Sequence, residues 1–260
     1  MFNYILYEVA NGVATITLNR PERFNAFVDG MNQEVTEAFK KAGKDTKVRV
    51  VVITGAGKAF CSGQDLKDIQ GQVGQRSLGV SVVQRYNPMI LQVAQTAKPV
   101  ICRLNGVAAG AGCSLALACD MIIAAEEAKL IEVFVNAGLV LDSGSSYFLP
   151  RSLGLKKAFE LAAMATPVTA AEALQLGLVN KVVPAAELDA AVELVTAYFA
   201  TAPTKAIGMI KKMLAKGANS SLEESLQYEA YCQEIAGQSN DYREGVTAFV
   251  EKRKPVFSGT

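Results

Sequence analysis

The chain has 260 residues, half of them hydrophobic, and a formal net charge of +1. This length can bury a large core, and the near-zero charge provides no broad basic surface, so we expect no nucleic-acid partner. The sequence contains no histidine, which excludes Ser-His-Asp triads, Cys-His dyads and histidine-ligated metal sites. Acid–base chemistry would therefore fall to carboxylates, Lys, Tyr or Cys, and we expect no metal.

The cellular location is predicted from three patterns. The start of the chain lacks the apolar stretch of a signal peptide, and no apolar run reaches the roughly 18 residues that cross a bilayer. The five cysteines include no Cys-x-x-Cys pair, which favours reduced, buried thiols over a disulfide framework. We expect a cytoplasmic protein with no membrane partner.

The first half of the chain is predicted to alternate strands and helices. Residues 2–9 and 13–18 flank Asn11-Gly12, a strong hairpin signal, and a helix is predicted over 29–41. Short apolar runs over 48–54, 98–104 and 121–125 indicate buried strands, and the apolar stretch 112–119 indicates a buried helix. The repeated strand–loop–helix pattern predicts an α/β fold with parallel strands and crossovers.

The second half is predicted to be mainly helical. Capping boxes begin at Thr169 and Ser221, and after a strand over 179–183 we predict helices near 187–200, 203–216, 221–236 and 239–250. Residues 67–80, rich in Gly, Gln and Ser, are predicted to form a flap. We predict a core over 1–200 and a helical region over 201–260.

Two glycine-rich loops follow predicted strands, over 55–66 and 106–112. The first is not a Walker A loop, because Ala59 follows Gly57-Lys58, and neither loop matches the dinucleotide fingerprint. Glycines here would let backbone N–H groups approach a ligand near a helix start. Two such N–H groups could form an oxyanion hole for a thioester carbonyl. Alternatively, the glycines only allow tight packing of strand against helix.

Four motifs in the same order resemble the crotonase (enoyl-CoA hydratase/isomerase) superfamily across essentially the whole chain. They occupy residues 19–26, 59–66, 105–113, and 241–245 together with 249–253. The resemblance implies a crotonase-type spiral of ββα units, with a C-terminal helical trimerisation region over 201–260. It also implies a homotrimer or dimer of trimers, an acyl-CoA substrate, and no cofactor beyond the CoA carried by that substrate.

The resemblance also implies site residues. The oxyanion N–H groups would come from Ser62 and Ala111, where alanine replaces the usual glycine. Phe249 and Lys252 match positions that reach the coenzyme of a neighbouring subunit, although Lys252 could also be an exposed helix end. The full set of predicted substrate- and CoA-binding residues is Arg23, Asn25, Ala26, Lys58, Gly63, Gln64, Asp65, Leu66, Gly110, Phe134, Phe249 and Lys252.

The acidic residues favour an isomerase over a hydratase. Hydratases of this superfamily carry two glutamates at positions that are Ser114 and Phe134 here, and neither side chain is a carboxylate. Asp142 matches the catalytic aspartate of several isomerases in the superfamily. The overall pattern is most similar to the ring-opening 1,2-epoxyphenylacetyl-CoA isomerases. We therefore predict an acyl-CoA isomerase in which Asp142 is the single acid/base, shifting a double bond or isomerising a ring epoxide.

Other interpretations remain open from the sequence. Asp142 could simply cap the helix that follows Ser143-Gly144. A 3,4- to 2,3-enoyl-CoA isomerase with linear substrates would use the same residues. The chain could also be a hydratase-like enzyme or a non-catalytic binding subunit, since fold alone does not decide function.

Overall fold

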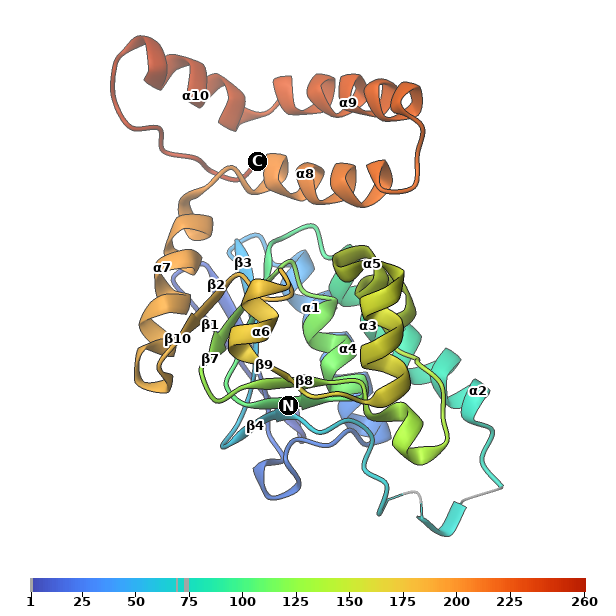
Figure 1. The fold of residues 1–260 in the computed structure, drawn as a ribbon. Helices are drawn as coiled ribbons and strands as arrows, with labels where there is room; N and C mark the ends of the chain where they lie inside the picture. Colours follow the sequence, from blue (N-terminus) through green and yellow to red (C-terminus); the bar gives the residue numbers. More distant parts are fainter. Residues whose placement is uncertain (1, 69, 73–74) are drawn as a thin grey trace.

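The computed structural model describes residues 2–68, 70–72 and 75–260, and its core is built on two β-sheets (Figure 1). The larger sheet has six strands in the order β1-β2-β3-β5-β7-β10, and the smaller has four in the order β4-β6-β8-β9. The larger sheet contains β1 (Ile5–Ala10), β2 (Val13–Leu18), β3 (Val50–Gly55), β5 (Val100–Leu104), β7 (Met121–Ala125) and β10 (Lys181–Val183). The smaller sheet contains β4 (Ala59–Cys61), β6 (Val107–Ala109), β8 (Lys129–Ile131) and β9 (Val168–Thr169).

The chain winds between these sheets as a spiral. It leaves the larger sheet after β3, β5 and β7 and immediately adds β4, β6 and β8 to the smaller one. The pairs β2–β3, β3–β5, β5–β7, β4–β6 and β6–β8 are all parallel. The predicted α/β spiral with parallel strands is confirmed, and it brings both glycine-rich loops to one edge of the smaller sheet.

The predicted hairpin at Asn11-Gly12 is confirmed. β1 and β2 pair antiparallel with Ala10 opposite Val13. Asn11 has φ 50° and Gly12 has φ 80°, as a two-residue turn with two left-handed residues requires. The predicted strands over 48–54, 98–104 and 121–125 correspond to β3, β5 and β7. The strands of the smaller sheet were not predicted, because each is at most three residues long.

Helices cover the sheets and fill the connections. The apolar face of α1, including Met31, Val35 and Phe39, is fully buried in the core. The predicted helix over 112–119 is α4, and α5 is interrupted at Gly154, where the backbone is not helical. The helices of the core are α1 (Asp29–Lys44), α2 (Leu78–Ser81), α3 (Asn87–Gln95), α4 (Ala111–Leu117), α5 (Ser145–Met164), α6 (Ala170–Gln175) and α7 (Leu188–Thr201). Short helical turns are η1 (Pro21–Arg23), η2 (Gln70–Gln72), η3 (Val82–Tyr86), η4 (Val133–Ala137) and η5 (Ala185–Glu187).

Three further helices form a separate layer beyond the core (Figure 1). They are α8 (Thr204–Gly217), α9 (Leu222–Gly237) and α10 (Asn240–Val250), and they match the predicted helices. Both capping boxes, at Thr169 and Ser221, are formed. Leu214 and Phe249 are 72% and 84% exposed, so this layer presents apolar side chains that its own chain does not cover. The boundary near residue 200 and the trimerisation role of the layer stay predictions.

The predicted flap over 67–80 includes residues 69, 73 and 74, which lie outside the described residues. Its described remainder leads through α2 and η3 into α3.

Across the part of the chain that the structure describes, no helix combines the length and apolar character needed to cross a membrane.

Candidate active site

The first glycine-rich loop is held by backbone pairing to the segment that follows η1. Phe27 and Gln64 form an isolated parallel bridge, in which Phe27 donates to Gly63 O at 2.7 Å and accepts from Asp65 N at 2.9 Å. In a parallel bridge of this kind, the N–H and C=O of the central residue, here Gln64, point away from the partner residue, here Phe27. The N–H of Gln64 therefore faces away from Phe27, and it has no hydrogen-bond partner among residues 2–68, 70–72 and 75–260.

The same pairing changes the predicted oxyanion donor. The N–H of Ser62 donates to Phe24 O at 3.0 Å, so it is already used inside the protein. Our assignment of that amide to an oxyanion hole needs correction: Gln64, two residues later, supplies the unused N–H. The Gln64 side chain is not free, because Nε2 donates to Phe27 O at 3.0 Å.

The second loop supplies another unused N–H close by. Gly110, with φ 51°, donates to Ile131 O at 2.9 Å, and Ala111 begins α4. The first N–H groups of a helix have no partner within it, and none is found for Ala111 in the described chain. A Cβ built on Gly63 would lie 2.9 Å from Ala109 O and 3.6 Å from Ala111 N. Gly63 thus lets the two loops approach, which brings the amides of Gln64 and Ala111 together.

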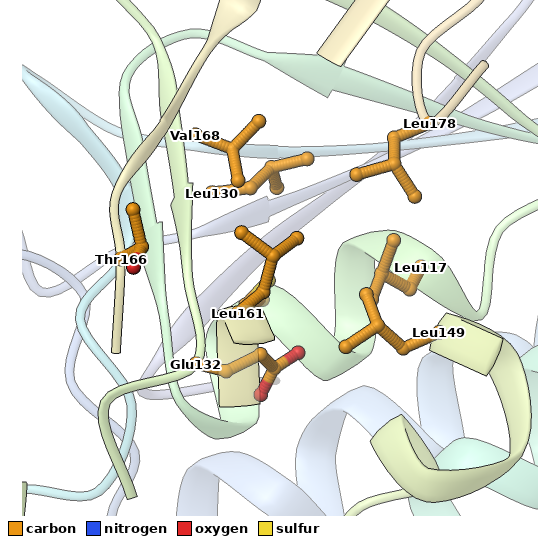
Figure 2. Close-up of a pocket in the computed structure, with 9 residues that line it drawn as sticks. Leu117, Leu130, Glu132, Leu149, Leu161, Thr166, Val168 and Leu178 are labelled. Carbon is orange, nitrogen blue, oxygen red and sulfur yellow. The ribbon is translucent and has the colours of Figure 1, made fainter. Parts of the chain in front are cut away.

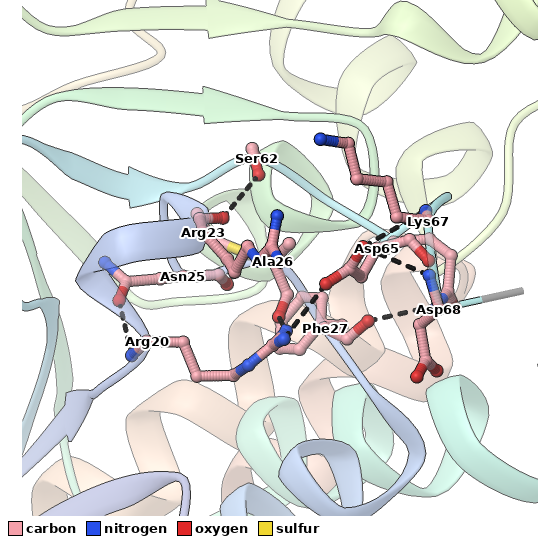
Figure 3. Close-up of polar contacts among 11 residues, drawn as sticks. Arg20, Arg23, Asn25, Ala26, Phe27, Ser62, Asp65, Lys67 and Asp68 are labelled. Carbon is pink, nitrogen blue, oxygen red and sulfur yellow. Dashed lines mark hydrogen bonds and ion pairs between the residues drawn. The ribbon is translucent and has the colours of Figure 1, made fainter.

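Two side chains that we expected to contact the coenzyme are used to hold the first loop (Figure 3). Asn25 is fully buried; it accepts from Arg20 N at 2.9 Å and donates to Ala56 O and Ala59 O at 2.9 and 2.8 Å. Asp65 accepts from Arg20 Nη2 at 3.0 Å, and Arg20 Nη1 donates to Ala26 O at 2.5 Å. The sequence analysis did not single out Arg20, which lies in the first family motif.

The environment of Asp65 stabilises its charge. Burial acts to raise the pKa of Asp65, but the hydrogen bond from Arg20 and the N–H groups of Asp68 and Lys67 outweigh it, so the pKa is lowered. Asp65 is therefore an ionised structural anchor, and it links the first motif to the loop that carries the Gln64 amide.

The remaining predicted ligands fall into two places. Arg23, Lys58 and Leu66 are exposed beside the first loop, where a coenzyme could reach them. Phe249 and Lys252, at the end of α10, lie in the outer helical layer (Figure 1). Their contact with coenzyme stays a prediction that requires a neighbouring subunit.

Asp142 lies between η4 and α5 and is half-buried. Ser143 Oγ donates to Asp142 Oδ1 at 2.7 Å, and Ser114 Oγ lies 3.4 Å from the Asp142 carbonyl. Burial raises the pKa of Asp142, and the Ser143 hydrogen bond offsets part of that rise. The alternative that Asp142 caps α5 is wrong, because Gly144 is the N-cap and no side chain caps this helix in the described structure.

A tyrosine that sequence analysis missed connects these parts. Tyr86 is 4% exposed, and its hydroxyl donates to Gln64 Oε1 at 2.5 Å. Burial raises the pKa of Tyr86, the charge of Arg85 opposes this rise, and the charge of Asp142 adds to it. No sequence pattern marks Tyr86, since it lies where η3 passes into α3.

Comparison with known proteins identifies the family. The model of the enoyl-CoA hydratase/isomerase family matches residues 8–260. The chain belongs to the enoyl-CoA hydratase/isomerase family. It is 41% identical to the 1,2-epoxyphenylacetyl-CoA isomerase of Escherichia coli over the full length of both chains. It is 39% identical to a probable enoyl-CoA hydratase of Rhodobacter capsulatus, covering 99% of each chain. The crystal structure of an enoyl-CoA hydratase from Bacillus anthracis is 32% identical, with a TM-score of 0.93 over 99% of this chain and 100% of that one.

Within this enoyl-CoA hydratase/isomerase family member, the two positions expected to carry hydratase glutamates have other roles. Ser114 is fully buried and lies 2.6 Å from Ser145 Oγ. Phe134 is 9% exposed, and its ring approaches within 3.9 Å of the Cβ position of Gly110. The carboxyl nearest to Phe134 in the sequence, Glu132, is 3% exposed and was missed by the sequence analysis.

Proposed function

We propose that this family member is an isomerase of CoA thioesters, with Asp142 as its single acid/base. The observation that carries the proposal is the close approach of the two loops at Gly63, together with a half-buried Asp142 whose carbonyl lies 3.4 Å from Ser114 Oγ of α4. Two unused amides and one carboxyl are the groups needed to form an enolate and move its proton.

The amides of Gln64 and Ala111 would bind the thioester oxygen. Negative charge grows on this oxygen when the neighbouring C–H is deprotonated, so fixed N–H donors stabilise the transition state more than the ground state. The Tyr86 hydroxyl and the Arg20–Asp65 ion pair hold the loop that carries the Gln64 amide. Ala111 keeps its N–H despite the methyl group that replaces the usual glycine hydrogen.

Asp142 would take the proton and return it elsewhere on the acyl group. The carboxylate accepts a proton from the carbon beside the carbonyl, the electron pair moves to the thioester oxygen, and the acid then protonates a different carbon. With a ring-epoxide substrate, the same acid can protonate the opening oxygen. The raised pKa of Asp142 suits a group that must both accept and release a proton.

The likeness to 1,2-epoxyphenylacetyl-CoA isomerase makes a ring-epoxide thioester the first substrate to test. We expect the active assembly to be a trimer or a dimer of trimers, in which the exposed apolar side chains of α8–α10 are covered and Phe249 reaches a neighbouring coenzyme.

The test compares products rather than rates alone. Purified protein is incubated in D2O with 1,2-epoxyphenylacetyl-CoA, linear 3-enoyl-CoAs and linear 2-enoyl-CoAs, and the products and their deuterium content are analysed by mass spectrometry. We expect isomerised products that carry solvent deuterium, and Asp142→Asn should reduce their formation by a factor of about 1000, since it removes the proton acceptor.

Asp189→Asn is the matched control, because Asp189 of α7 is an exposed carboxylate that pairs with Arg103 of β5. It should retain wild-type product formation. Hydration of 2-enoyl-CoAs that survives Asp142→Asn would contradict the proposal and support the hydratase alternative. A wild-type protein that binds CoA esters and converts none would support the binding-subunit alternative.

A further inference from the structure

Glu132 is a carboxyl enclosed by apolar side chains behind the proposed site. It follows β8 and is 3% exposed, and it borders a void of about 10 Å³. Figure 2 shows its side chain at the void together with leucines, Val168 and Thr166. Its polar surroundings are neutral: Ser145 Oγ donates to Oε1 at 2.8 Å, and the Cys113 thiol lines the same void. Oε2 has no partner within the described residues.

Two hydroxyls connect this carboxyl to the loop of Asp142. Ser145 Oγ lies 2.6 Å from Ser114 Oγ, and either oxygen can be the donor. Ser114 Oγ in turn lies 3.2 Å from Gly110 O and 3.4 Å from Asp142 O. The hydrogen-bond chain therefore runs from Glu132 through Ser145 of α5 and Ser114 of α4. It ends at two carbonyls, Gly110 O beside the proposed oxyanion donor and Asp142 O of the proposed acid/base.

The number of protons limits the directions that these hydrogen bonds can take, because each hydroxyl has a single proton to donate. When Glu132 is ionised, it accepts from Ser145, and Ser145 must accept from Ser114. The Ser114 proton is then unavailable to the carbonyls. When Glu132 is neutral, it can donate to Ser145, Ser145 donates to Ser114, and Ser114 donates to Gly110 O or Asp142 O.

We propose that Glu132 is a positioning residue for the reaction at Asp142: its protonation state selects the direction of the Ser145–Ser114 hydrogen bonds and thereby decides whether Ser114 holds the Asp142 main chain. This inference rests on the proposed role of Asp142 as the acid/base. It gives the chain a second carboxyl that acts on the site without touching the substrate.

Both directions of the Ser145–Ser114 hydrogen bonds are accessible near neutral pH. Burial raises the pKa of Glu132 to about 7, the hydrogen bonds from Ser145 and Cys113 oppose the rise, and the charge of Asp142 adds to it. The titratable groups that face Glu132 are Cys113 from α4 and Asp142 from the loop before α5. The side chains facing it from β8, β9 and α5 around the void are apolar: Leu130, Val168, Leu149 and Leu161.

The coupling between the two carboxyls is reciprocal. An ionised Asp142 favours neutral Glu132, whose hydrogen-bond direction lets Ser114 hold the Asp142 carbonyl. When Asp142 accepts a proton from the substrate, this bias disappears and ionisation of Glu132 becomes easier. The direction of the Ser145–Ser114 hydrogen bonds is thus linked to whether Asp142 has already accepted the proton from the substrate.

The first arm of the test needs no substrate. The infrared band of a protonated carboxyl is followed in the wild-type protein between about pH 5 and about pH 9, on either side of the expected pKa, with Glu132→Gln as the reference. We expect a band that is absent in Glu132→Gln and disappears from the wild type with a midpoint near pH 7. Asp142→Asn should move this midpoint to lower pH, because the neighbouring charge is removed. A midpoint that Asp142→Asn leaves in place would overturn the coupling.

The second arm measures kcat against pH with the thioester that the wild type isomerises. We expect a step of about 5-fold with an apparent pKa near that infrared midpoint, corresponding to one hydrogen bond. Glu132→Gln, which keeps the shape, and Ser145→Ala, which interrupts the chain, should both lose this step. Glu160→Gln, at an exposed carboxyl of α5 that pairs with Lys157, should retain it. Circular dichroism checks that each variant is folded.

The outcomes separate this inference from the proposed function. A wild type that isomerises thioesters while both variants keep its pH profile would overturn the positioning role and leave the function intact. A wild type without isomerase activity would overturn the function and with it the positioning role, while the infrared arm still decides whether the two carboxyls are coupled.

Discussion

Two nearly buried carboxyls of this chain, Asp65 and Glu132, have opposite environments. Asp65 is 8% exposed and Glu132 is 3% exposed, so burial opposes the charge of both. Asp65 contacts the Arg20 guanidinium and two backbone N–H groups, and its pKa is lowered. Glu132 accepts a hydrogen bond from a hydroxyl and shares its void with a thiol, and its pKa is raised to about 7. The available partners, more than burial, decide whether a buried carboxyl carries charge.

The difference divides the proposed oxyanion hole into two halves. The loop with the Gln64 amide is fixed by an ion pair, whereas the loop with the Ala111 amide is backed by neutral hydrogen bonds. The pH dependences are therefore opposite. Asp65 contributes stability above its unfolded pKa of 3.8, which is lost as the pH falls through its lower folded value. The contribution of Glu132 is present below its unfolded pKa of 4.5 and is lost as the pH rises through about 7.

The largest expected effect comes from removing the Ala111 amide, which lies in the loop backed by neutral hydrogen bonds. Ala111 is the first residue of α4, a position where proline is tolerated, so Ala111→Pro removes the N–H while the helix can still form. We expect kcat for isomerisation to fall by about 100- to 1000-fold. Leu222→Pro is the control, since Leu222 is the exposed first residue of α9. Equal kcat values for Ala111→Pro and the wild type would contradict the role of this amide.

The second effect is on stability and its pH dependence. Because burial raises the pKa of Glu132 from 4.5 to about 7, ionising it in the folded protein costs about 3 kcal/mol more than in the unfolded chain. Glu132→Gln removes this cost. The difference in unfolding free energy between the variant and the wild type should therefore increase by up to about 3 kcal/mol between about pH 5 and about pH 8, measured by urea denaturation. Glu160→Gln should show no such trend, and a constant difference for Glu132→Gln would refute the prediction.

The third effect tests the Arg20–Asp65 ion pair, which fixes the loop with the Gln64 amide. Arg20→Met leaves Asp65 buried without its guanidinium and should lower the unfolding free energy by about 2 kcal/mol at neutral pH, since the pair is only partly exposed. The loss should shrink as the pH falls below 3.8 and Asp65 takes up a proton, which is the reverse of the Glu132 trend. Combining Arg20→Met with Asp65→Asn should recover part of the loss at neutral pH. If the changes in unfolding free energy of Arg20→Met and Asp65→Asn, measured by urea denaturation, simply add in the double variant, the ion pair does not contribute to stability.

The smallest expected effect concerns the contact that holds the Gln64 side chain. Tyr86→Phe removes a hydrogen bond of about 1 kcal/mol, so kcat should fall by about 5-fold with little change in KM. Tyr198→Phe, at a 65% exposed tyrosine of α7, should have no effect. A rise in KM at unchanged kcat would indicate that Tyr86 binds substrate instead of positioning the loop.

Much of the fold could be predicted because its signals are local. The Asn11-Gly12 turn, the five- and six-residue strands β3, β5 and β7, and the capping boxes at Thr169 and Ser221 each depend on neighbouring residues. The short strands of the smaller sheet carry no such signal and form only because the spiral brings them together. A helix after Ser143-Gly144 was expected, but its bounds were not predicted, since Pro150 and Gly154 interrupt the pattern of α5.

For the site, the sequence by itself determined the two loops and Asp142 as a candidate acid. Only the tertiary structure decided that the Ser62 amide is occupied and that the Gln64 amide has no partner among the described residues, because that depends on pairing with Phe24 and Phe27, almost forty residues earlier. It also decided that Glu132 is a buried carboxyl with neutral partners, since α4, β8 and α5 each supply one side of its environment. The direction of an N–H group and the pKa of a carboxyl are set by neighbours in space, which can lie far apart along the chain.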